Sequence, residues 1–275
     1  MLFHCGRFEL DLATPRIMGI LNVTTDSFSD GGAYATTTAA VGRAWQLIEA
    51  GAELIDIGGE STRPGAQPAS LDEELSRVVP VVEALRDAPV AISVDTMKTE
   101  VMRASLAAGA SLINDVNALR APGALELLAR SEAGICLMHM QGEPRSMQHA
   151  PSYTDVLADV GVFLARRAAV LLAGGIAKER ILLDPGIGFG KTLEHNLALL
   201  RGLPQLAGLG FPLLLGVSRK SMLGKITGRD VHERLPASLA AALFCVMRGA
   251  SIIRVHDVAE TRDALLTYKA LTGDQ

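Results

Sequence analysis

The sequence predicts a single (β/α)8 TIM barrel over residues 1–275, and three observations support this fold class. Short apolar runs alternate with amphipathic helix patterns along the whole chain. Eight such runs occur, and their continuous apolar character is typical of parallel strands buried on both faces. Polar residues gather where these runs end, which is the face that carries the active site in barrels of this kind.

The predicted strands follow one another with room for a helix after each. They are "RIMGIL" (16–21), "ELIDIG" (53–58), "VAISVD" (90–95), "SLIND" (111–115), "GICLMH" (134–139), "ILLD" (181–184), "LLLGVS" (213–218) and "SIIRVH" (251–256). Ahead of them, "FHCGRFELD" predicts a short N-terminal hairpin that closes the barrel bottom. A doubly wound sheet is the alternative. It usually stops at about five to seven strands and has GxGxxG after the first, where this chain has "NVTTDSFSDGG".

Helix patterns between the strands have recognisable ends. Ser70-x-x-Glu73 and Ser152-x-x-Asp155 predict capping boxes or close relatives of them. "VMRASLAAGA" and "FLARRAAVLLAGGIA" carry apolar residues at helical spacing and end near glycine. Eight strands alternating with eight helices therefore favour the barrel.

Composition excludes several classes of partner. Apolar residues make up 49% of the chain, and 26 basic residues face 30 acidic ones without a concentrated basic stretch, which argues against nucleic-acid binding. Three widely separated cysteines without a CxxC motif are typical of a reducing compartment. No signal peptide is visible, and "ASLAAALFCVM" is about half the ~20 residues that span a bilayer. We expect a soluble cytoplasmic protein without a membrane partner.

Polar side chains lie at or near the end of every predicted strand. They are Asn22, Asp56, Asp95, Asn114, Asp115, His139, Asp184, Ser218, Arg219, Lys220, Arg254 and His256. Any one of the aspartates is explained equally well as a helix cap. Because all eight predicted strands have a polar residue at or near their end, helix capping alone is a poor explanation. We predict that these side chains converge on one face of the barrel.

The residues on this face divide into two kinds of chemistry. Asp95, Asn114 and Asp184 offer carboxylate and amide groups, which suit a flat heterocycle with amide and amino groups along its edge. A second set consists of Asn22, Arg63, Arg254 and His256, with Lys220 near. Its charges and the bidentate contacts of arginine suit phosphate or pyrophosphate, with Mg²⁺ held by Asn22. Metal hydrolases require clusters such as HxH or HExxH, and serine hydrolases require a GxSxG elbow, and this sequence contains none of them.

The stretch "ILLDPGIGFGKT" (181–192) resembles a phosphate-binding P-loop but fails its first position, which is Pro185 instead of glycine. As a strand-to-helix junction of a barrel, it presents Asp184, sets Phe189 against a ring, and lets glycine backbone approach a ligand. We expect Lys191 and Thr192 to begin the next helix outside the site. The long polar loops 24–32 and 59–68 are predicted to act as lids.

These motifs together resemble those of the bacterial dihydropteroate synthases. The matching segments are "IMGILNVTTDSFSDGG" (17–32), "GAELIDIGGESTRPGA" (51–66), "SVDTMK" (93–98), "INDVNA" (113–118), "LLDPGIGFGKT" (182–192), "GVSRKSMLG" (216–224) and "IIRVHDV" (252–258). The resemblance implies a transferase of folate biosynthesis that condenses (7,8-dihydropterin-6-yl)methyl diphosphate with 4-aminobenzoate, releasing pyrophosphate and 7,8-dihydropteroate. It also implies a homodimer and inhibition by sulfonamides.

The resemblance further implies a role for each matching residue. Pterin binding is implied for Asp95, Asn114, Asp184 and Lys220. Diphosphate binding is implied for Asn22, Arg254 and His256, with Mg²⁺ close to Asn22. The aminobenzoate site is bordered by Thr62, Arg63, Pro64 and Ser221, with Phe189 beside it. Of these, Asp95, Asp184, Lys220 and Arg254 are expected to act in catalysis, which we hypothesise to be a largely dissociative substitution.

Two other functions remain open from the sequence. A methyltetrahydrofolate-binding methyltransferase domain needs a similar pterin pocket but no diphosphate-binding residues. A pterin-binding paralogue without activity would keep the pocket and lose loop residues or cations. The "STRP" loop and the pair Arg254 and His256 favour the synthase over both.

Overall fold

The computed structural model describes residues 1–23, 32–60, 68–143 and 146–273, and eight parallel strands form a closed barrel. These strands are β3 (Arg16–Asn22), β4 (Leu54–Gly58), β5 (Ala91–Asp95), β6 (Leu112–Asp115), β7 (Gly134–Met138), β8 (Ile181–Asp184), β9 (Leu213–Gly216) and β10 (Ala250–Val255). Each strand pairs with its neighbour in the sequence, and β10 closes on β3. The predicted barrel is confirmed, and the doubly wound sheet is excluded.

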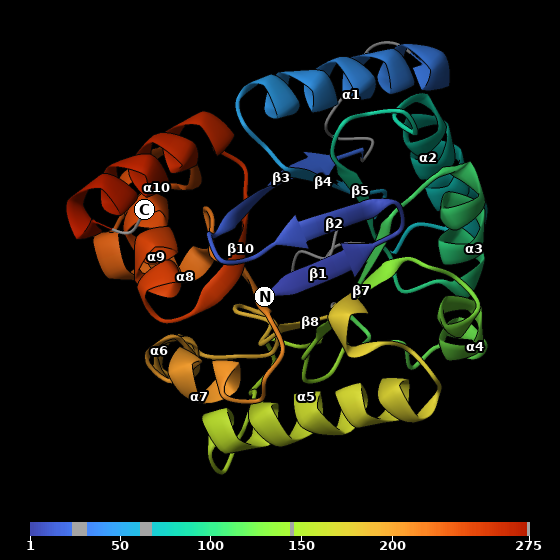
Figure 1. The fold of residues 1–275 in the computed structure, drawn as a ribbon. Coiled ribbons are helices and arrows are strands. Elements are labelled where there is room, and N and C mark those ends of the chain that lie inside the picture. Colours follow the sequence, from blue (N-terminus) through green and yellow to red (C-terminus); the bar gives the residue numbers. More distant parts are fainter. Residues whose placement is uncertain (24–31, 61–67, 144–145, 274–275) are drawn as a thin grey trace.

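Helices cover the outside of the barrel (Figure 1). They are α1 (Gly32–Glu49), α2 (Leu71–Ala84), α3 (Thr99–Ala108), α4 (Ala124–Ala129), α5 (Val156–Ala173), α6 (Leu193–Arg201), α7 (Leu203–Ala207), α8 (Ser221–Thr227), α9 (Leu235–Met247) and α10 (Val258–Thr272). Instead of one helix per connection, β8 and β9 are joined through α6 and α7, and β9 and β10 through α8 and α9. Within the described ranges, no helix combines the length and apolar character needed to cross a bilayer.

One of the two expected helix caps forms as predicted. Ser70 Oγ accepts a hydrogen bond from the Glu73 N–H at 3.2 Å, and Glu73 Oε2 accepts from the Ser70 N–H at 2.7 Å. The other was wrong, because α5 begins after Asp155, not after Ser152. The Asp155 carboxylate accepts from two N–H groups of the first turn, at 3.0 and 3.1 Å. One carboxylate thus satisfies two otherwise unpaired donors, and Ser152 stays outside the helix.

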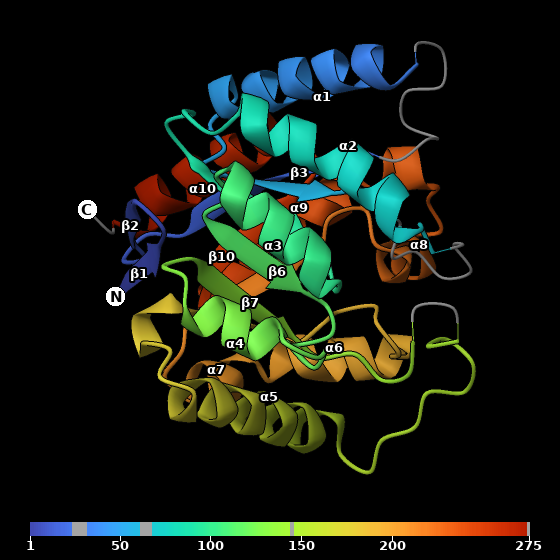
Figure 2. The ribbon, with the colours of Figure 1, turned by 90° about the vertical axis from the view of Figure 1, so that its right-hand side faces the viewer.

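The barrel bottom is closed by the antiparallel hairpin of β1 (Leu2–Cys5) and β2 (Phe8–Asp11), as the sequence predicts. Figure 1 shows it lying across the barrel strands, and Figure 2 shows it at one end of the barrel. Phe3 and Cys5 are fully buried against one apolar residue from each barrel strand. A β-carbon on Gly134 would lie 2.6 Å from the Phe3 ring, so the hairpin docks because this position is glycine.

Alternation along the strands sets which residues face the barrel interior. The interior floor consists of Met18, Leu54, Ala91, Leu112, Cys136, Leu182, Leu214 and Ile252. Residues one position away, such as Ile55 and Ile253, pack against the helices instead. Because side chains alternate along a strand, the next inward residues stand two positions further on. Those positions hold polar residues on five of the strands: Asp56, Ser93, Asn114, Asp184 and Arg254.

Candidate active site

A hydrogen-bonded polar centre stands directly above the apolar floor. Asp56, which is 0% exposed, accepts hydrogen bonds from Ser93 Oγ at 2.5 Å, Asn114 Nδ2 at 3.1 Å and Arg254 Nε at 2.6 Å. Arg254 also donates from Nη2 to Asp95 Oδ2 at 3.1 Å. The guanidinium therefore bridges two carboxylates, and it joins the predicted heterocycle-binding residues to the predicted phosphate-binding residues.

Asp56 and Ser93 belong to the polar centre, but neither was selected as a site residue from the sequence. Asp56 appeared only among the polar residues near strand ends, and Ser93 was not singled out. The signal was the two-residue spacing from the interior positions Leu54 and Ala91. This spacing is informative only when it is known which residues of each strand point into the barrel. A continuously apolar strand does not reveal that from its sequence.

Burial perturbs the ionisable groups of this centre. It raises the pKa of Asp95 to about 7; the Arg254 charge opposes that rise and the Asp56 charge adds to it. Burial also raises the pKa of Asp184, against the hydrogen bond that Gly186 N–H donates to its Oδ1 at 2.7 Å. Lys220 has its pKa lowered by burial to about 8, while Asp184 opposes the change. Perturbed groups gathered at one end of a barrel are typical of an active site.

The junction after β8 forms one wall of the site. Gly186 and Gly190 adopt positive φ angles, and a β-carbon on either would lie 2.0 or 2.4 Å from the backbone oxygens of His139 or Gln141. Lys220 Nζ donates to the Ile187 carbonyl oxygen and lies 4.4 Å from the centroid of the Phe189 ring. Close backbone packing thus explains the glycines that the sequence analysis noted.

An apolar cluster lies beside this junction. Val116, Met138, Met140 and Met147 are buried together, and Phe189 packs against them. Methionine and aromatic side chains present a polarisable surface suited to the face of a flat ring. The site therefore combines an apolar wall with the carboxylates of the polar centre.

Lys191 does not lie at the surface start of the next helix, and that expectation was wrong. It is 3% exposed, and its ammonium donates to the carbonyl oxygens of Gly186 and Phe189, both at 2.9 Å, and of His139 at 3.2 Å. The same nitrogen lies 3.0 Å from His139 Nδ1. Thr192 is the N-cap of α6, as expected. The lysine is buried because the glycine turn before it aims several carbonyl oxygens at one point.

We expect the Lys191→Met substitution to lower the free energy of unfolding by about 2–4 kcal/mol, because it leaves buried carbonyl oxygens without a donor. Urea denaturation measures this as a lower midpoint at an unchanged slope. Lys269→Met, at an exposed position of α10, is the matched control and should leave the midpoint within error. Equal midpoints for both variants would show that the buried ammonium does not stabilise the turn.

The remaining predicted residues lie around the rim. Ser218 Oγ lies 3.0 Å from His256 Nδ1 and accepts from the His256 N–H at 3.2 Å. Asn22 is half-buried at the end of β3, and Ser221 is exposed as the first residue of α8. A β-carbon on Gly58 would be 3.8 Å from Asn22 Oδ1 and from Asp95 Cβ, so glycine leaves space between the two.

Three polar residues near strand ends have structural roles instead. Asp115 accepts from the N–H groups of Asn117 and Leu119, both at 2.7 Å, and so fixes the turn after β6. His139 is buried against Lys191, and burial lowers its pKa to about 3. Arg219 pairs with Asp257.

Thr62, Arg63 and Pro64 lie outside the described residues, as do residues 24–31 and 61–67 of the two proposed lids. Among the side chains that the structure describes, no group of three His, Cys, Asp or Glu residues is arranged to hold a metal ion. A protein-built metal cage is therefore not visible in that part of the chain.

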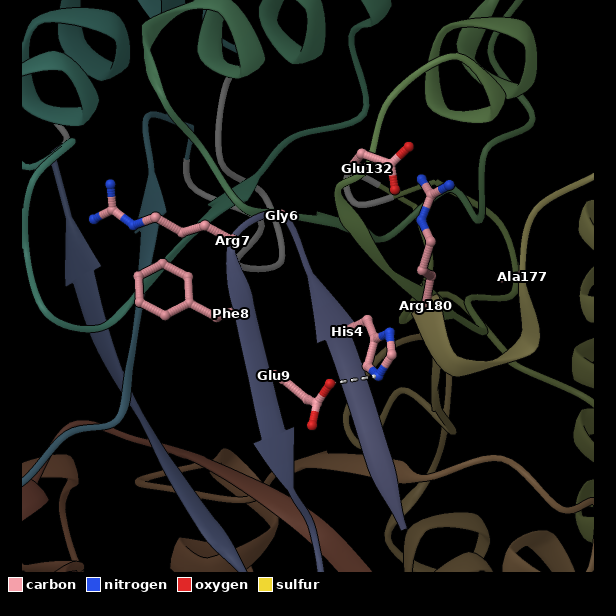
Figure 3. A pocket seen from close by; sticks show the side chains of 8 residues that line it. All are labelled: His4, Gly6, Arg7, Phe8, Glu9, Glu132, Ala177 and Arg180. Carbon is pink, nitrogen blue, oxygen red and sulfur yellow. Dashed lines mark ion pairs between the residues drawn. The ribbon is translucent and has the colours of Figure 1, made fainter.

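A further pocket lies at the hairpin (Figure 3), at the barrel bottom. His4 Nε2 lies 3.3 Å from Glu9 Oε2 there, and Arg180 donates to the carbonyl oxygens of Leu128 and Ala133, both at 2.9 Å. Gly6 N–H donates to the Glu132 carbonyl oxygen at 2.8 Å. The Gly6 hydrogen bond joins the hairpin to the rest of the chain, and the pocket lies at the opposite end of the barrel from the polar centre.

Comparison with known proteins places this arrangement in a family. The family described as pterin binding enzyme matches residues 18–256. A dihydropteroate synthase of Neisseria meningitidis serogroup C is 54% identical over 98% of this chain and 97% of its own length.

Two solved structures extend the comparison. A Yersinia pestis dihydropteroate synthase, described with a sulfonamide drug complex, has a TM-score of 0.93 at 50% identity and covers 99% of this chain and 100% of its own. A Burkholderia cenocepacia dihydropteroate synthase, complexed with 7,8-dihydropteroate, has a TM-score of 0.91 at 51% identity and covers 99% and 96%. In both cases the likeness extends over nearly the full length of each chain.

Proposed function

The chain belongs to the dihydropteroate synthase family, and we propose that its barrel mouth performs the family's reaction with the residue roles given below. It is a transferase of folate biosynthesis that condenses (7,8-dihydropterin-6-yl)methyl diphosphate with 4-aminobenzoate. One observation carries the assignment of roles. Arg254 bridges Asp56 and Asp95 and lies two residues before His256, so it connects the carboxylates of the polar centre with the rim.

The pterin ring is assigned to Asp95, Asn114, Asp184 and Lys220. Asn114 donates from Nδ2 to Asp56, so its Oδ1 is directed elsewhere and is available as an acceptor. Together with two carboxylates, it offers acceptors to the amino and N–H groups along the pterin edge. Lys220 supplies the one cation among these four residues and suits a ring carbonyl or ring nitrogen. The apolar cluster around Met138 gives the ring a face to lie on.

The diphosphate is assigned to Asn22, Arg254 and His256 at the rim. Arg254 lies near the end of β10, before Val255, and His256 follows directly after the strand, so both lie at the same end of the barrel. A guanidinium and an imidazole suit the oxygens of a leaving diphosphate through charge and hydrogen bonds. Arg63 is proposed for the same group from the second lid.

We propose that Mg²⁺ accompanies the diphosphate. Magnesium usually keeps several waters and binds one or two protein oxygens together with substrate phosphates. The Asn22 amide oxygen, beside the space left by Gly58, could supply one such protein oxygen. Among the described residues there is no group of three His, Cys, Asp or Glu that would bind the ion without the diphosphate. When bound there, the ion would neutralise charge on the diphosphate oxygens.

The aminobenzoate subsite is assigned to Thr62, Arg63, Pro64, Phe189 and Ser221. Ser221 begins α8, and the N-terminus of a helix favours a carboxylate through its unpaired N–H groups. Because the similar Yersinia structure is described with a sulfonamide drug, we propose that sulfonamides compete for this subsite here. We also propose a cytoplasmic homodimer, as the family resemblance implies.

The residues suit a largely dissociative substitution. No nucleophilic side chain is required, since the aminobenzoate nitrogen attacks the methylene carbon and the carbon–oxygen bond to diphosphate breaks. Asp95 and Asp184 stabilise the positive charge that develops on the pterin, while Arg254 and His256 stabilise the departing negative charge. The lids are proposed to exclude water, which would trap the cation as an alcohol.

Positional isotope exchange tests this mechanism. With ¹⁸O in the oxygen that joins the methylene carbon to the diphosphate, and no aminobenzoate, reversible cleavage of the carbon–oxygen bond should scramble the label into non-bridging phosphate positions. A dissociative step predicts scrambling when pyrophosphate is retained by the closed site. Absence of both scrambling and release under these conditions would instead support concerted attack.

A pH–rate profile tests the roles of Asp95 and Lys220. We expect kcat/KM for the pterin diphosphate to rise with pH through about 7, as Asp95 ionises, and to fall above about 8, as Lys220 loses its proton. Lys220→Arg should abolish the alkaline fall, because arginine stays charged. A profile that stays flat between pH 6 and 9 would contradict both roles.

Product formation tests the function itself. The purified protein with Mg²⁺ and both substrates should release one pyrophosphate for each 7,8-dihydropteroate formed. A paralogue without activity would bind the pterin and give no turnover. A methyltransferase domain would bind methyltetrahydrofolate with no requirement for diphosphate. The 54% identity to a dihydropteroate synthase favours the synthase over both.

A further inference from the structure

We propose that Asp56 is a positioning residue that anchors Arg254, and that Asp95 is the exchangeable partner from which substrate releases it. In this account, the inner side of the guanidinium stays on Asp56 throughout the reaction. Its outer end moves from Asp95 to the diphosphate when the pterin occupies Asp95. The inference rests on the proposed role of Arg254 at the diphosphate.

The two carboxylates differ in how firmly they are held. Asp56 is 0% exposed and accepts from Ser93, Asn114 and Arg254, which come from three different strands. The Asp95 side chain is 12% exposed, and within the described residues Arg254 is its only hydrogen-bond donor. Its carboxylate is therefore the one that can change partner without breaking up the barrel interior.

The two ends of the guanidinium are held by different carboxylates, and we propose that the contact with Asp56 is kept while the contact with Asp95 is exchanged. Nε, the nitrogen nearest the side-chain stem, bonds to Asp56 at 2.6 Å, and the terminal Nη2 bonds to Asp95 at 3.1 Å. A substrate that takes the Asp95 carboxylate leaves Nη2 without its acceptor. Rotation about the retained contact with Asp56 then directs the outer end toward the rim, where His256 lies directly after the end of β10.

The Asp56 charge decides where the guanidinium rests. In a buried site, two carboxylates share one cation, so neither holds it alone. If position 56 loses its charge, Asp95 becomes the sole anionic partner in this pair and retains Arg254. Substrate would then have to break a stronger ion pair before the diphosphate could recruit the same side chain.

Asp56→Asn removes this charge while it keeps the hydrogen bonds. The amide oxygen can accept from Arg254 and Asn114 in the place of Oδ2, and the amide NH2 can donate to Ser93 Oγ, whose hydroxyl rotates to accept. The fold and the Asn114 orientation should persist. Any functional effect would therefore report the lost anchor charge and not a collapsed pocket.

A double-mutant cycle with Arg254→Met tests the proposal. We expect Asp56→Asn to lower kcat/KM for the pterin diphosphate, and to weaken calorimetric binding of inorganic pyrophosphate with Mg²⁺, each by about tenfold. In the Arg254→Met background, the same change should leave both quantities unchanged or slightly improved, because an unpaired buried negative charge is removed. It should also raise the Tm of that background.

Asp115→Asn is the matched control, since Asp115 is an equally buried carboxylate on the next strand but one, and among the described residues its hydrogen bonds come from backbone N–H groups alone. Its effects should be the same in both backgrounds. Equal losses from Asp56→Asn with and without Arg254, or no loss in either, would overturn the proposal. If the unaltered protein makes no product, the proposed function fails, whereas the pyrophosphate cycle still decides whether Asp56 acts through Arg254.

Discussion

Arg254→Met should lower kcat/KM for the pterin diphosphate by about 10³-fold or more. The guanidinium is the cation that links the two halves of the site, and the leaving diphosphate gains charge as the carbon–oxygen bond breaks. Losing it removes stabilisation that is greatest in the transition state, so most of the effect should appear in kcat. Steady-state kinetics with saturating aminobenzoate measures the loss.

The same substitution should also destabilise the fold. It leaves Asp56 and Asp95 buried without their shared cation, which typically costs about 3–5 kcal/mol when one partner of a buried pair is removed. Arg16→Met is the matched control, because Arg16 pairs with Glu53 at the other end of β3 and takes no part in the site. A loss of activity in Arg254→Met no larger than in this control would contradict the role of Arg254.

Asp184→Asn should lower kcat/KM by about 10²-fold, because a charged acceptor for the pterin edge becomes a neutral amide. Asp184 Oδ1 accepts from the Gly186 N–H at 2.7 Å, and within the described residues Oδ2 receives no hydrogen bond. That oxygen is therefore available to the ring. The substituted amide keeps its shape, but its NH2 group opposes an N–H donor of the ligand.

The loss should appear in the affinity for a dihydropterin as well as in turnover, and calorimetry measures it directly. Asp155→Asn is the matched control, since asparagine caps a helix about as well as aspartate and Asp155 lies at the start of α5. Unchanged dihydropterin affinity in Asp184→Asn would remove this carboxylate from the pterin pocket.

The fold was predictable from the sequence because its signal is repeated. Each of the eight apolar runs is long enough to cross the barrel, and each is followed by room for a helix. The hairpin was predictable from "FHCGRFELD", and the structure adds that Gly134 admits Phe3. The second helix in two of the connections was not expected, since short helices such as α7 lack a strong periodic pattern.

The site was predictable at the strand ends and less so inside the barrel. Asp95, Asn114, Asp184, Arg254 and His256 were selected as candidates because polar residues stand out after apolar runs. Strand alternation and the closure of β10 onto β3 decide which side chains face one another inside the barrel. Neither can be predicted from a short stretch of sequence. For this reason, Asp56 was seen as polar but not as the acceptor shared by three strands.

Lys191 shows a different limit. Its place after "GFG" is typical of a solvent-exposed helix start, and long charged residues are rarely buried. Only the turn formed by Gly186, Gly188 and Gly190 brings several carbonyl oxygens to one point. Because three of the contacts of its Nζ are to backbone oxygens, no residue pattern in the sequence indicates that this lysine is buried.

The central claim is that the pterin and diphosphate subsites meet at Arg254. Calorimetric titration of 6-methyl-7,8-dihydropterin, with and without saturating pyrophosphate and Mg²⁺, tests this most directly. The account predicts that pyrophosphate strengthens dihydropterin binding, because each ligand favours the position of Arg254 that the other requires, and the coupling must be reciprocal. Mutually exclusive binding, or the same dihydropterin affinity with and without pyrophosphate, would contradict it.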